Sequence, residues 1–303
     1  MTLAFLACAE RGRLEPQTLL LVRSIRRWGG RFREAPVFTF QPRAGTEVSD
    51  ATAAALRDLS VTHVTERLNE RFPDYGIANK VFACAWAEER VPADVLVFLD
   101  SDSVLLGEPS ALDVPPGTDA AVRPVDRKHQ GSTGPSDPHD GFWRAAYAAT
   151  GVRGEPFVRT TVDDEEIRAY FNAGLVAARR DAGVMTRWRD HFLRLMDASL
   201  VPPHGRITFL DQVALATALA DAMPRVRIPD ATHNYPLPLR PILPRALRET
   251  PLDAMVHVHY HKWFQRPGFL REISPPLDPR DERFRWLEER LPLEPTIDDP
   301  LRW

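Results

Sequence analysis

The segment from residue 95 to residue 106 constrains the fold more than any other part of the chain. It reads VLVFLDSDSVLL, in which an apolar run ends in two carboxylates, Asp100 and Asp102. A strand that is apolar on both faces is typical of a buried, mostly parallel sheet covered by helices. Ligands of such α/β proteins bind at the carboxyl ends of the strands. The segment therefore predicts an α/β fold with a site just after the apolar run.

The two carboxylates are separated by one residue, which determines how they can act together. Side chains at positions i and i+2 of an extended segment point the same way. Asp100 and Asp102 can therefore face one divalent cation that is also bound by phosphate oxygens. The alternative is that both aspartates only cap the following turn, where Asp is a common residue. The rest of the chain favours the metal–diphosphate site.

Alternating strand and helix patterns surround this segment. The predicted strands are residues 2–9, 35–40, 61–64, 95–100, 120–123, 170–178 and 255–260, and the predicted helices are residues 15–28, 51–59, 77–90, 182–196, 209–223 and 281–290. This alternation indicates βαβ units, so we expect a mostly parallel central sheet flanked by helices, with a smaller antiparallel part. Residues 126–140 carry almost no apolar side chain and are predicted to form a mobile surface loop or lid.

The composition excludes several classes of protein. The 303 residues carry a net charge of -3, whereas a nucleic-acid-binding protein needs a dominant basic surface, so no nucleic-acid partner is expected. No run approaches the roughly 20 apolar residues of a membrane span. The apolar start at residues 2–9 is too short and wrongly flanked for a signal peptide. We therefore expect a cytoplasmic protein without a transmembrane segment.

Three histidines alternate in the late strand, which reads MVHVHYHKW. One face of the strand is expected to carry His257, His259 and His261, and the other face carries the residues between them. A single histidine there would most often be a satisfied core or surface residue, but three together predict that at least one binds a metal or a phosphate. Imidazole suits first-row transition metals and suits magnesium poorly, so the set points to manganese without excluding magnesium.

Two further passages place polar residues where a ligand could bind. In TFLDQVALATAL, Asp211 and Gln212 fall in the first turn of a helix. The helix dipole favours an acid there and Thr208 is a candidate cap, but the same geometry would also let both side chains reach sugar hydroxyls. In YFNAGLV, Asn172 and Gly174 interrupt an apolar strand, which predicts either a bulge or the close approach of a ligand to the backbone.

Together these passages resemble the GT-A glycosyltransferases, in particular the retaining family that includes glycogenin and the bacterial lipopolysaccharide galactosyltransferases. FLDSDSVLL is similar to that family's Asp-x-Asp strand, FNAGLV to its Phe-Asn-Ala-Gly strand, LDQVAL to its Asp-Gln helix start and HYHKW to its late His motif. The resemblance implies one Rossmann-like GT-A catalytic domain over residues 1–264, with a nucleotide-binding half at about 1–125 and an acceptor-side half at about 140–264. Residues 265–303 would form a Pro-rich segment with one amphipathic helix.

The resemblance also implies an activity. We expect a metal-dependent glycosyltransferase of the hexosyltransferase class, which moves a sugar from a UDP- or GDP-sugar to a small-molecule or glycan acceptor with retention of anomeric configuration. The implied metal is Mn²⁺ or Mg²⁺, held by Asp100, Asp102 and His259. The family's late motif usually continues through Gly and Lys-Pro-Trp, which this chain lacks. His261 and His257 are therefore alternates for the histidine ligand.

The remaining site residues follow from the same resemblance. The residues implied to act on the transferring sugar or the acceptor are Asn172, Asp211 and Gln212. The residues implied to bind the donor are Lys80, Asp100, Ser101, Asp102, Lys262, Ala7 and Cys8. The first strand ends in ACAERGR, which differs from the family's usual base-binding loop. The resemblance therefore does not identify the base.

Other functions stay open at this point. An apolar strand followed by Asp-x-Asp also fits a haloacid-dehalogenase-type phosphatase, with Asp100 as nucleophile and Asp102 as acid. That motif normally opens its domain, whereas a long α/β region precedes it here. A non-catalytic nucleotide-sugar binding protein is a second alternative. An inverting transferase would need a general base, for which Asp211 and Asp164 are candidates, and no feature of the sequence sets the oligomeric state.

Overall fold

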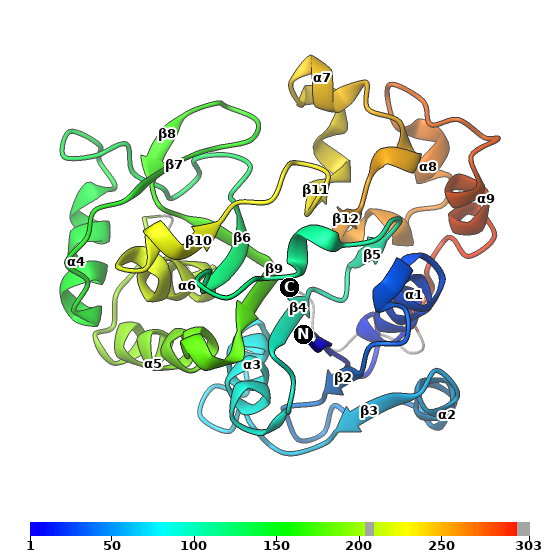
Figure 1. The fold of residues 1–303 in the computed structure, drawn as a ribbon, viewed down its shortest axis with the longest axis horizontal. Helices are drawn as coiled ribbons and strands as arrows, with labels where there is room; N and C mark the ends of the chain where they lie inside the picture. The colour runs from blue at the N-terminus through cyan, green and yellow to red at the C-terminus, as the bar shows by residue number, and fades with distance from the viewer. Residues whose placement is uncertain (204–208, 296–303) are drawn as a thin grey trace.

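The computed structural model describes residues 1–203 and 209–295. Its centre is a seven-stranded sheet with the order β10–β6–β9–β4–β1–β2–β3 (Figure 1). The strands of this sheet are β1 (Leu3–Cys8), β2 (Val37–Phe40), β3 (Val61–Val64), β4 (Val95–Leu99), β6 (Ala120–Pro124), β9 (Phe171–Arg179) and β10 (Val226–Arg227). Strands β1 to β4 are parallel, while β9 runs antiparallel to both of its neighbours. The predicted mostly parallel α/β sheet is confirmed.

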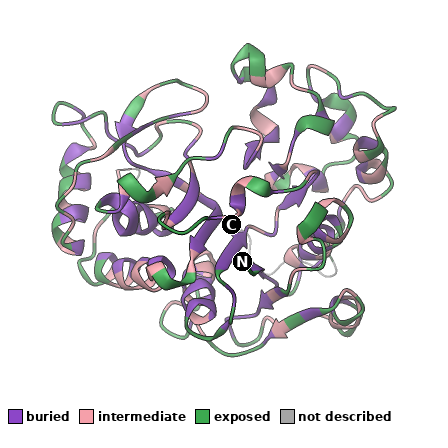
Figure 2. Ribbon diagram, viewed as in Figure 1, coloured by how far each residue is buried: buried purple, intermediate pink, exposed green. Residues whose placement is uncertain are grey.

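Helices cover both faces of this sheet (Figure 1). The helices are α1 (Leu14–Trp28), α2 (Asp50–Asp58), α3 (Asn79–Arg90), α4 (Asp140–Thr150), α5 (Val184–Asp197), α6 (Leu210–Ala220), α7 (Arg245–Arg248), α8 (Phe269–Glu272) and α9 (Glu282–Glu288). Alternate residues of one strand pack in different clusters: Phe98 packs with α3, α5 and α6, whereas Val97 packs with α1 and α2. The central strands are buried throughout (Figure 2), as their apolar sequences predict.

A second sheet of three strands brings the late histidines to the aspartate pair. It consists of β5 (Ser103–Leu105), β12 (His257–His259) and β11 (Tyr235–Pro236). Strand β12 is antiparallel to β5, and His259 pairs with Ser103. The run that reads as one segment in the sequence is therefore two strands in two sheets, joined by a turn at residues 100–102.

The C-terminal segment packs on this second sheet. Leu270, Phe284 and Leu287 share a hydrophobic cluster with Val104 of β5 and Val258 of β12. The predicted helix at residues 281–290 is α9. The domain boundary expected after residue 264 stays a prediction, and the apolar cluster spans it.

The segment at residues 126–140 is a loop with several exposed residues, as expected, but some of its polar residues are buried. Gln130, Ser132 and Asp140 are buried, and the backbone N–H of Arg168 donates a hydrogen bond of 2.7 Å to the Ser132 carbonyl. The buried guanidinium of Arg168 also lies 2.6 Å from Asp140. Helix α4 and the hairpin of β7 (Phe157–Arg159) and β8 (Glu166–Arg168), which cover the segment, were not predicted. Polar groups that satisfy one another across the chain leave no apolar pattern in the sequence.

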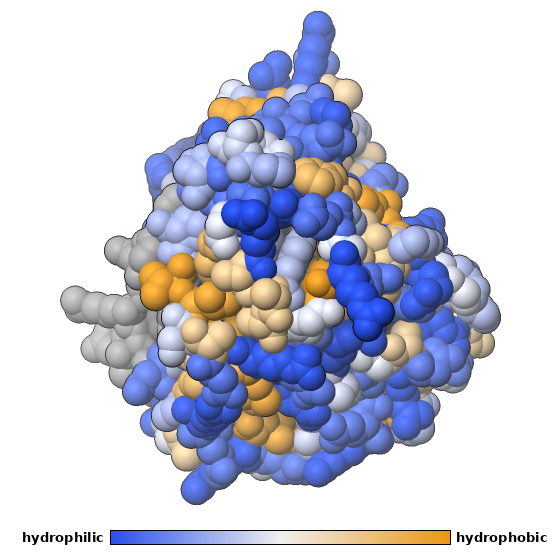
Figure 3. Space-filling model, turned by 90° about the vertical axis from the view of Figure 1, so that its left-hand side faces the viewer, coloured by the Kyte–Doolittle hydropathy of each residue, from blue (hydrophilic) through white to orange (hydrophobic). Residues whose placement is uncertain are grey.

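The surface on one side of the molecule is mainly hydrophilic (Figure 3). Figure 3 shows one side of the molecule, where apolar residues form several small patches among hydrophilic ones. Separate apolar residues are normal on a protein surface. Within residues 1–203 and 209–295, no helix has the length and apolar character needed to cross a membrane.

Strand β9 is irregular at the two residues that interrupt its apolar pattern. Its pairing with β6 shifts register next to Asn172, and the Asn172 side chain accepts a hydrogen bond of 2.8 Å from the Gly174 N–H. The ring of His259 also packs against Gly174, so closely that a Cβ there would lie 2.7 Å from the ring. The predicted bulge is present, and what approaches the backbone is a histidine of the second sheet.

Replacing Gly174 by Ala is expected to destabilise the fold by about 1–3 kcal/mol, because the new methyl group forces the His259 ring away from β9. The measurement is the free energy of unfolding in urea. Gly141→Ala is the matched control, because a Cβ at that helical position meets no atom within 4 Å. An unfolding free energy of Gly174→Ala equal to that of the wild type would show that the close packing is unimportant.

Candidate active site

The turn at residues 100–102 is held from three sides. The Asp100 N–H donates to the Gly174 carbonyl of β9 at 2.9 Å, and the Ser101 hydroxyl donates to the Cys8 carbonyl at the end of β1. Tyr260, just after β12, donates its N–H to the Asp102 carbonyl at 3.0 Å. The predicted donor residue Ser101 therefore directs its side chain toward β1. These bonds fix the backbone from which both carboxylates project.

Asp102 lies against two histidines. The Nε2 atom of His259 is 3.0 Å from Asp102 Oδ1, and the Nδ1 atom of His261 is 3.9 Å from Oδ2. The two imidazole rings stack with their centroids 4.1 Å apart. One ligand atom from each of the three residues lies within 4.8 Å of the others. Two imidazoles and a carboxylate are a donor set that fits a first-row transition metal such as manganese.

The structure distinguishes among the three predicted histidines. His261 has a left-handed backbone, with φ of 52°, and its ring stacks on that of His259. His257 is fully buried, and its Nδ1 accepts a hydrogen bond of 3.1 Å from the Asn234 N–H. His259 and His261 thus converge on Asp102, while His257 is outside this group of three.

The charges of these groups depend on one another. Burial alone would raise the pKa of Asp102, but His259 and His261 outweigh it and hold that pKa below its usual value. The pKa of His259 is raised, because the attraction of Asp102 exceeds the opposing effect of burial. Burial and the neighbouring His259 lower the pKa of His261 to about 4. His261 is therefore neutral at pH 7, the form in which imidazole binds metals.

Asp100 has a different partner. Lys80, in the first turn of α3, places its ammonium group 2.6 Å from Asp100 and 3.8 Å from Asp211. Burial would lower the pKa of Lys80, but the two carboxylates outweigh it and raise that pKa. The two aspartates of the turn therefore pair with different groups, Asp100 with Lys80 and Asp102 with the two histidines. A role for Asp100 as a metal ligand stays a prediction.

Asp211 is buried in the first turn of α6, and its nearest counter-charge is the ammonium group of Lys80 at 3.8 Å. Its side chain belongs to a residue only 1% exposed, and neither carboxylate oxygen makes a hydrogen bond within the described residues. Burial raises its pKa to about 6 against the attraction of Lys80. The indole N–H of Trp188 donates to the Asp211 carbonyl at 2.7 Å, which anchors the helix start. Thr208, the predicted cap, lies outside the described residues.

The remaining predicted residues vary in exposure. Gln212 is partly exposed beside Asp211, and Lys262 is exposed with no ion-pair partner in residues 1–203 and 209–295. Ala7 and Cys8 are buried at the end of β1, and burial raises the pKa of the Cys8 thiol. Asp164, a candidate general base, is exposed in the turn between β7 and β8.

One residue near Asp102, His259 and His261 was not identified as a site residue from the sequence. Asp126 follows β6, and burial raises its pKa to about 6, with Arg123 and His259 opposing the rise. The influence of His259 places Asp126 close to the group of Asp102, His259 and His261. Its position could have identified it. Asp126 comes just after a predicted strand, at the edge of the sheet where Asp100 comes just after β4.

Two solved structures share this fold. The apo structure of the bifunctional glycosyltransferase WbbM aligns with a TM-score of 0.53 and 16% identity, covering 96% of this chain and 51% of that one. The apo structure of mouse xyloside xylosyltransferase 1 aligns with a TM-score of 0.51 and 13% identity, covering 86% of this chain and 97% of that one. The chain thus spans about half the length of WbbM. At these identities the likeness concerns the fold.

The comparison of sequences identifies the protein family, which the comparison of structures does not. No curated protein matches the chain, but the sequence profile of one protein family does. The profile of the Rhodobacterales glycosyltransferase domain matches residues 5–222, which include β1, the aspartate turn, β9 and the start of α6. The chain therefore belongs to the Rhodobacterales glycosyltransferase domain family and is a glycosyltransferase of the GT-A type.

Proposed function

We propose that this glycosyltransferase uses a nucleotide-sugar donor, a UDP- or GDP-sugar, and depends on a divalent metal, with Mn²⁺ preferred over Mg²⁺. The observation that carries the proposal is the convergence of Asp102, His259 and His261 beside the Lys80–Asp100 ion pair. A cation bound there supplies electrostatic neutralisation of the departing diphosphate. Asp102, His259 and His261 would hold it, with Asp100 as the further ligand that the family resemblance implies.

Lys80 supplies a fixed positive charge in the same place. Its ammonium group is charged at neutral pH, because the neighbouring Asp100 and Asp211 raise its pKa. A preorganised charge of this kind stabilises negative charge that develops on a leaving phosphate, at little cost in reorganisation. Lys262, exposed after β12, would add a second ammonium group on the solvent side of the donor.

Asp211, Gln212 and Asn172 would bind the hydroxyl groups of the transferring sugar or the acceptor. A buried carboxylate without hydrogen-bond donors is costly, and both oxygens of Asp211 lack them within the described residues. Sugar hydroxyls would supply those donors. We propose retention of configuration, which rests on the resemblance to the retaining family. If the enzyme inverts instead, Asp211 is the better candidate base, because it is buried beside Lys80, whereas Asp164 is exposed and pairs with Arg159 of its own hairpin.

Family membership also bears on the alternatives. The Asp-x-Asp pattern alone is also compatible with a phosphatase. The family profile that matches residues 5–222, however, is that of a glycosyltransferase domain. A binding protein without activity would hold the donor yet release no nucleotide. Melting temperatures measured with a panel of nucleotide sugars, with and without manganese, would identify the donor, because a ligand of the folded state raises its melting temperature.

Asp102→Asn is expected to lower kcat/KM by about 10²–10³-fold, a loss typical of removing one electrostatic contact to the developing charge. The measurement is nucleotide release from the identified donor in the presence of manganese. The control is Asp181→Asn, an exposed carboxylate at the opposite edge of the sheet, where β9 pairs with the start of β4. Undiminished turnover of Asp102→Asn, or full activity after removal of metal by a chelator, would show that the proposed metal site is wrong.

The histidines are expected to differ in metal binding. His259→Ala and His261→Ala should each weaken manganese affinity by at least about 10–100-fold, because that is the range for groups that only orient a ligand and the loss of a ligand costs no less. His257→Asn should retain the affinity, because His257 is not among the three converging residues. Titration calorimetry with Mn²⁺ on the donor-free protein measures this. Loss of affinity in His257→Asn alone would reassign the ligand.

Asp211→Asn is expected to make the metal-free protein more stable and less active. The pKa of Asp211 is about 6 in the folded protein against 3.8 for an unperturbed aspartate, so the folded state binds the proton more tightly than the unfolded state. The wild type therefore loses stability as pH rises from about 4 to 6, by about 3 kcal/mol, and stays at the lower level above pH 6. Asp211→Asn lacks this loss. Urea unfolding at pH 4.5 and pH 8 measures it, and equal pH dependence in both proteins would refute the assignment.

A further inference from the structure

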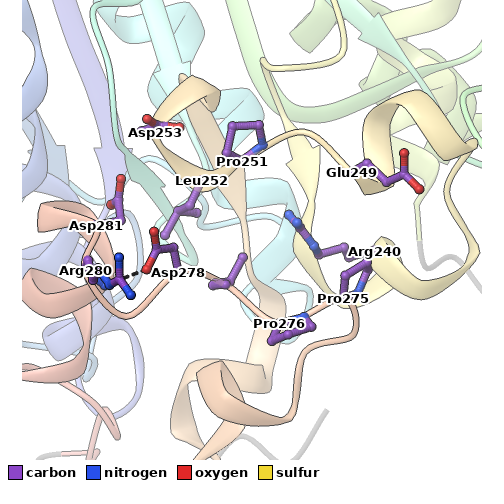
Figure 4. Close-up of a pocket in the computed structure, with 11 residues that line it drawn as sticks. Arg240, Glu249, Pro251, Leu252, Asp253, Pro275, Pro276, Asp278, Arg280 and Asp281 are labelled. Carbon is purple, nitrogen blue, oxygen red and sulfur yellow. Dashed lines mark hydrogen bonds between the residues drawn. The ribbon is translucent and has the colours of Figure 1, made fainter.

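A cavity lies in the C-terminal part of the molecule. It has a volume of about 440 Å³ and lies between residues 249–253, which precede β12, and residues 275–281, which join α8 to α9 (Figure 4). None of the candidate active-site residues lines it. Volumes of this size are typical of small-molecule sites. The cavity is therefore separate from the metal and donor site.

Arg240 provides a buried positive charge in the wall of this cavity. The residue lies in the 3-10 helix η6 (Leu237–Ile242) and is 3% exposed. Figure 4 shows its guanidinium group directed toward the space between Pro251 and Pro276. Its contact with a side chain is long, at 3.4 Å from Nη1 to the Tyr235 hydroxyl. Its Nε has no hydrogen-bond partner in the part of the chain that the structure describes.

No carboxylate compensates this charge within ion-pair distance, as far as residues 1–203 and 209–295 show. Asp278 instead accepts a hydrogen bond of 2.8 Å from the Arg280 N–H (Figure 4), and Asp281 caps α9 through the N–H groups of Arg283 and Phe284. A guanidinium group cannot lose its proton in a protein. A buried charge without a partner strongly destabilises the folded state. An anion bound in the cavity would therefore stabilise the folded protein.

The rest of the lining narrows the chemistry of the ligand. Apolar walls come from Leu252, Leu277 and three prolines. The carboxylates of Glu249, Asp253, Asp278 and Asp281 lie around them, together with a second cationic side chain, that of Arg280. Carboxylates accept hydrogen bonds from hydroxyl groups and repel any further anionic group that does not pair with a cation. The cavity therefore suits a small molecule with one anionic group and several hydroxyl groups. It does not suit a polyanion.

We propose that this cavity binds a small hydroxylated molecule carrying one carboxylate or phosphate group, with Arg240 as its counter-charge. A planar guanidinium group pairs with either anion through two hydrogen bonds. Sugar acids and sugar phosphates are the two sources of this chemistry. The inference is independent of the donor and metal assigned to the active site.

The test measures binding by titration calorimetry to the full chain at constant ionic strength, with glucuronate, glucose 6-phosphate and uncharged glucose as probes. At least one of the two anions is expected to bind, and the stronger of them identifies the anionic group. Arg240→Met should weaken that binding by at least about tenfold. The control Arg57→Met removes the same charge from an exposed position of α2 outside the cavity and should leave binding unchanged.

Several outcomes would overturn the proposal: no binding of either anion, equal binding of glucose, or equal weakening by the two substitutions. The ligand-free stability of Arg240→Met gives a second readout, because removal of an unpaired buried charge should leave the melting temperature unchanged or raise it. If Arg240→Met does not fold, Arg240→Lys replaces it. Lysine keeps the charge without the planar fork, so unchanged affinity in that variant would also contradict the assigned role.

Discussion

The antiparallel pairing of β5 with β12 is the interaction on which the active site depends. It sets His259 opposite Ser103 and so brings an imidazole to Asp102 from 157 residues away in the chain. The close packing of the His259 ring on Gly174 fixes the ring from the other side. The aspartate turn itself is tied to β1, β9 and the residue after β12. A site built on strands in this way is more rigid than one built on loops.

The groups around the aspartate turn carry more negative than positive charge, and this excess favours the binding of a cation. Four carboxylates are opposed by three cationic groups. The carboxylates are Asp100, Asp102, Asp126 and Asp211, and the cationic groups are Lys80, Arg123 and His259, whose pKa is raised. The raised pKa values of Asp126 and Asp211 follow from burial that the available positive charge does not offset. A bound cation is often the largest charge in such a site and reverses this balance. The excess of carboxylates thus supports the proposed metal more strongly than the Asp-x-Asp spacing does.

Local patterns predicted the parts of the fold whose cause is local. The apolar strands, the helices beside them and the bulge near Asn172 follow from periodicity and from polar residues that interrupt it. The division of the run at residues 95–106 between two sheets was not predictable, because it depends on the pairing of β5 with β12. The same holds for the buried polar residues of the segment at residues 126–140, where Arg168 and Asp140 pair across 28 residues. Likewise, no spacing rule distinguishes His261 from His257, since a left-handed backbone turns only the former onto His259.

Asp211 and Arg240, which belong to the two proposed ligand sites, illustrate how ligand binding and stability would be linked in this chain. Each is a buried charge that the described residues leave without a close counter-charge at hydrogen-bond distance, and each therefore lowers the stability of the ligand-free fold. The two charges have opposite signs and lie in separate parts of the molecule, so they cannot compensate each other. A ligand that pairs with either charge binds the folded state alone, and by mass action it restores the stability that the unpaired charge removes. The fold of the free protein is thus less stable than its packing would permit, and the missing stability is available to its ligands as binding energy.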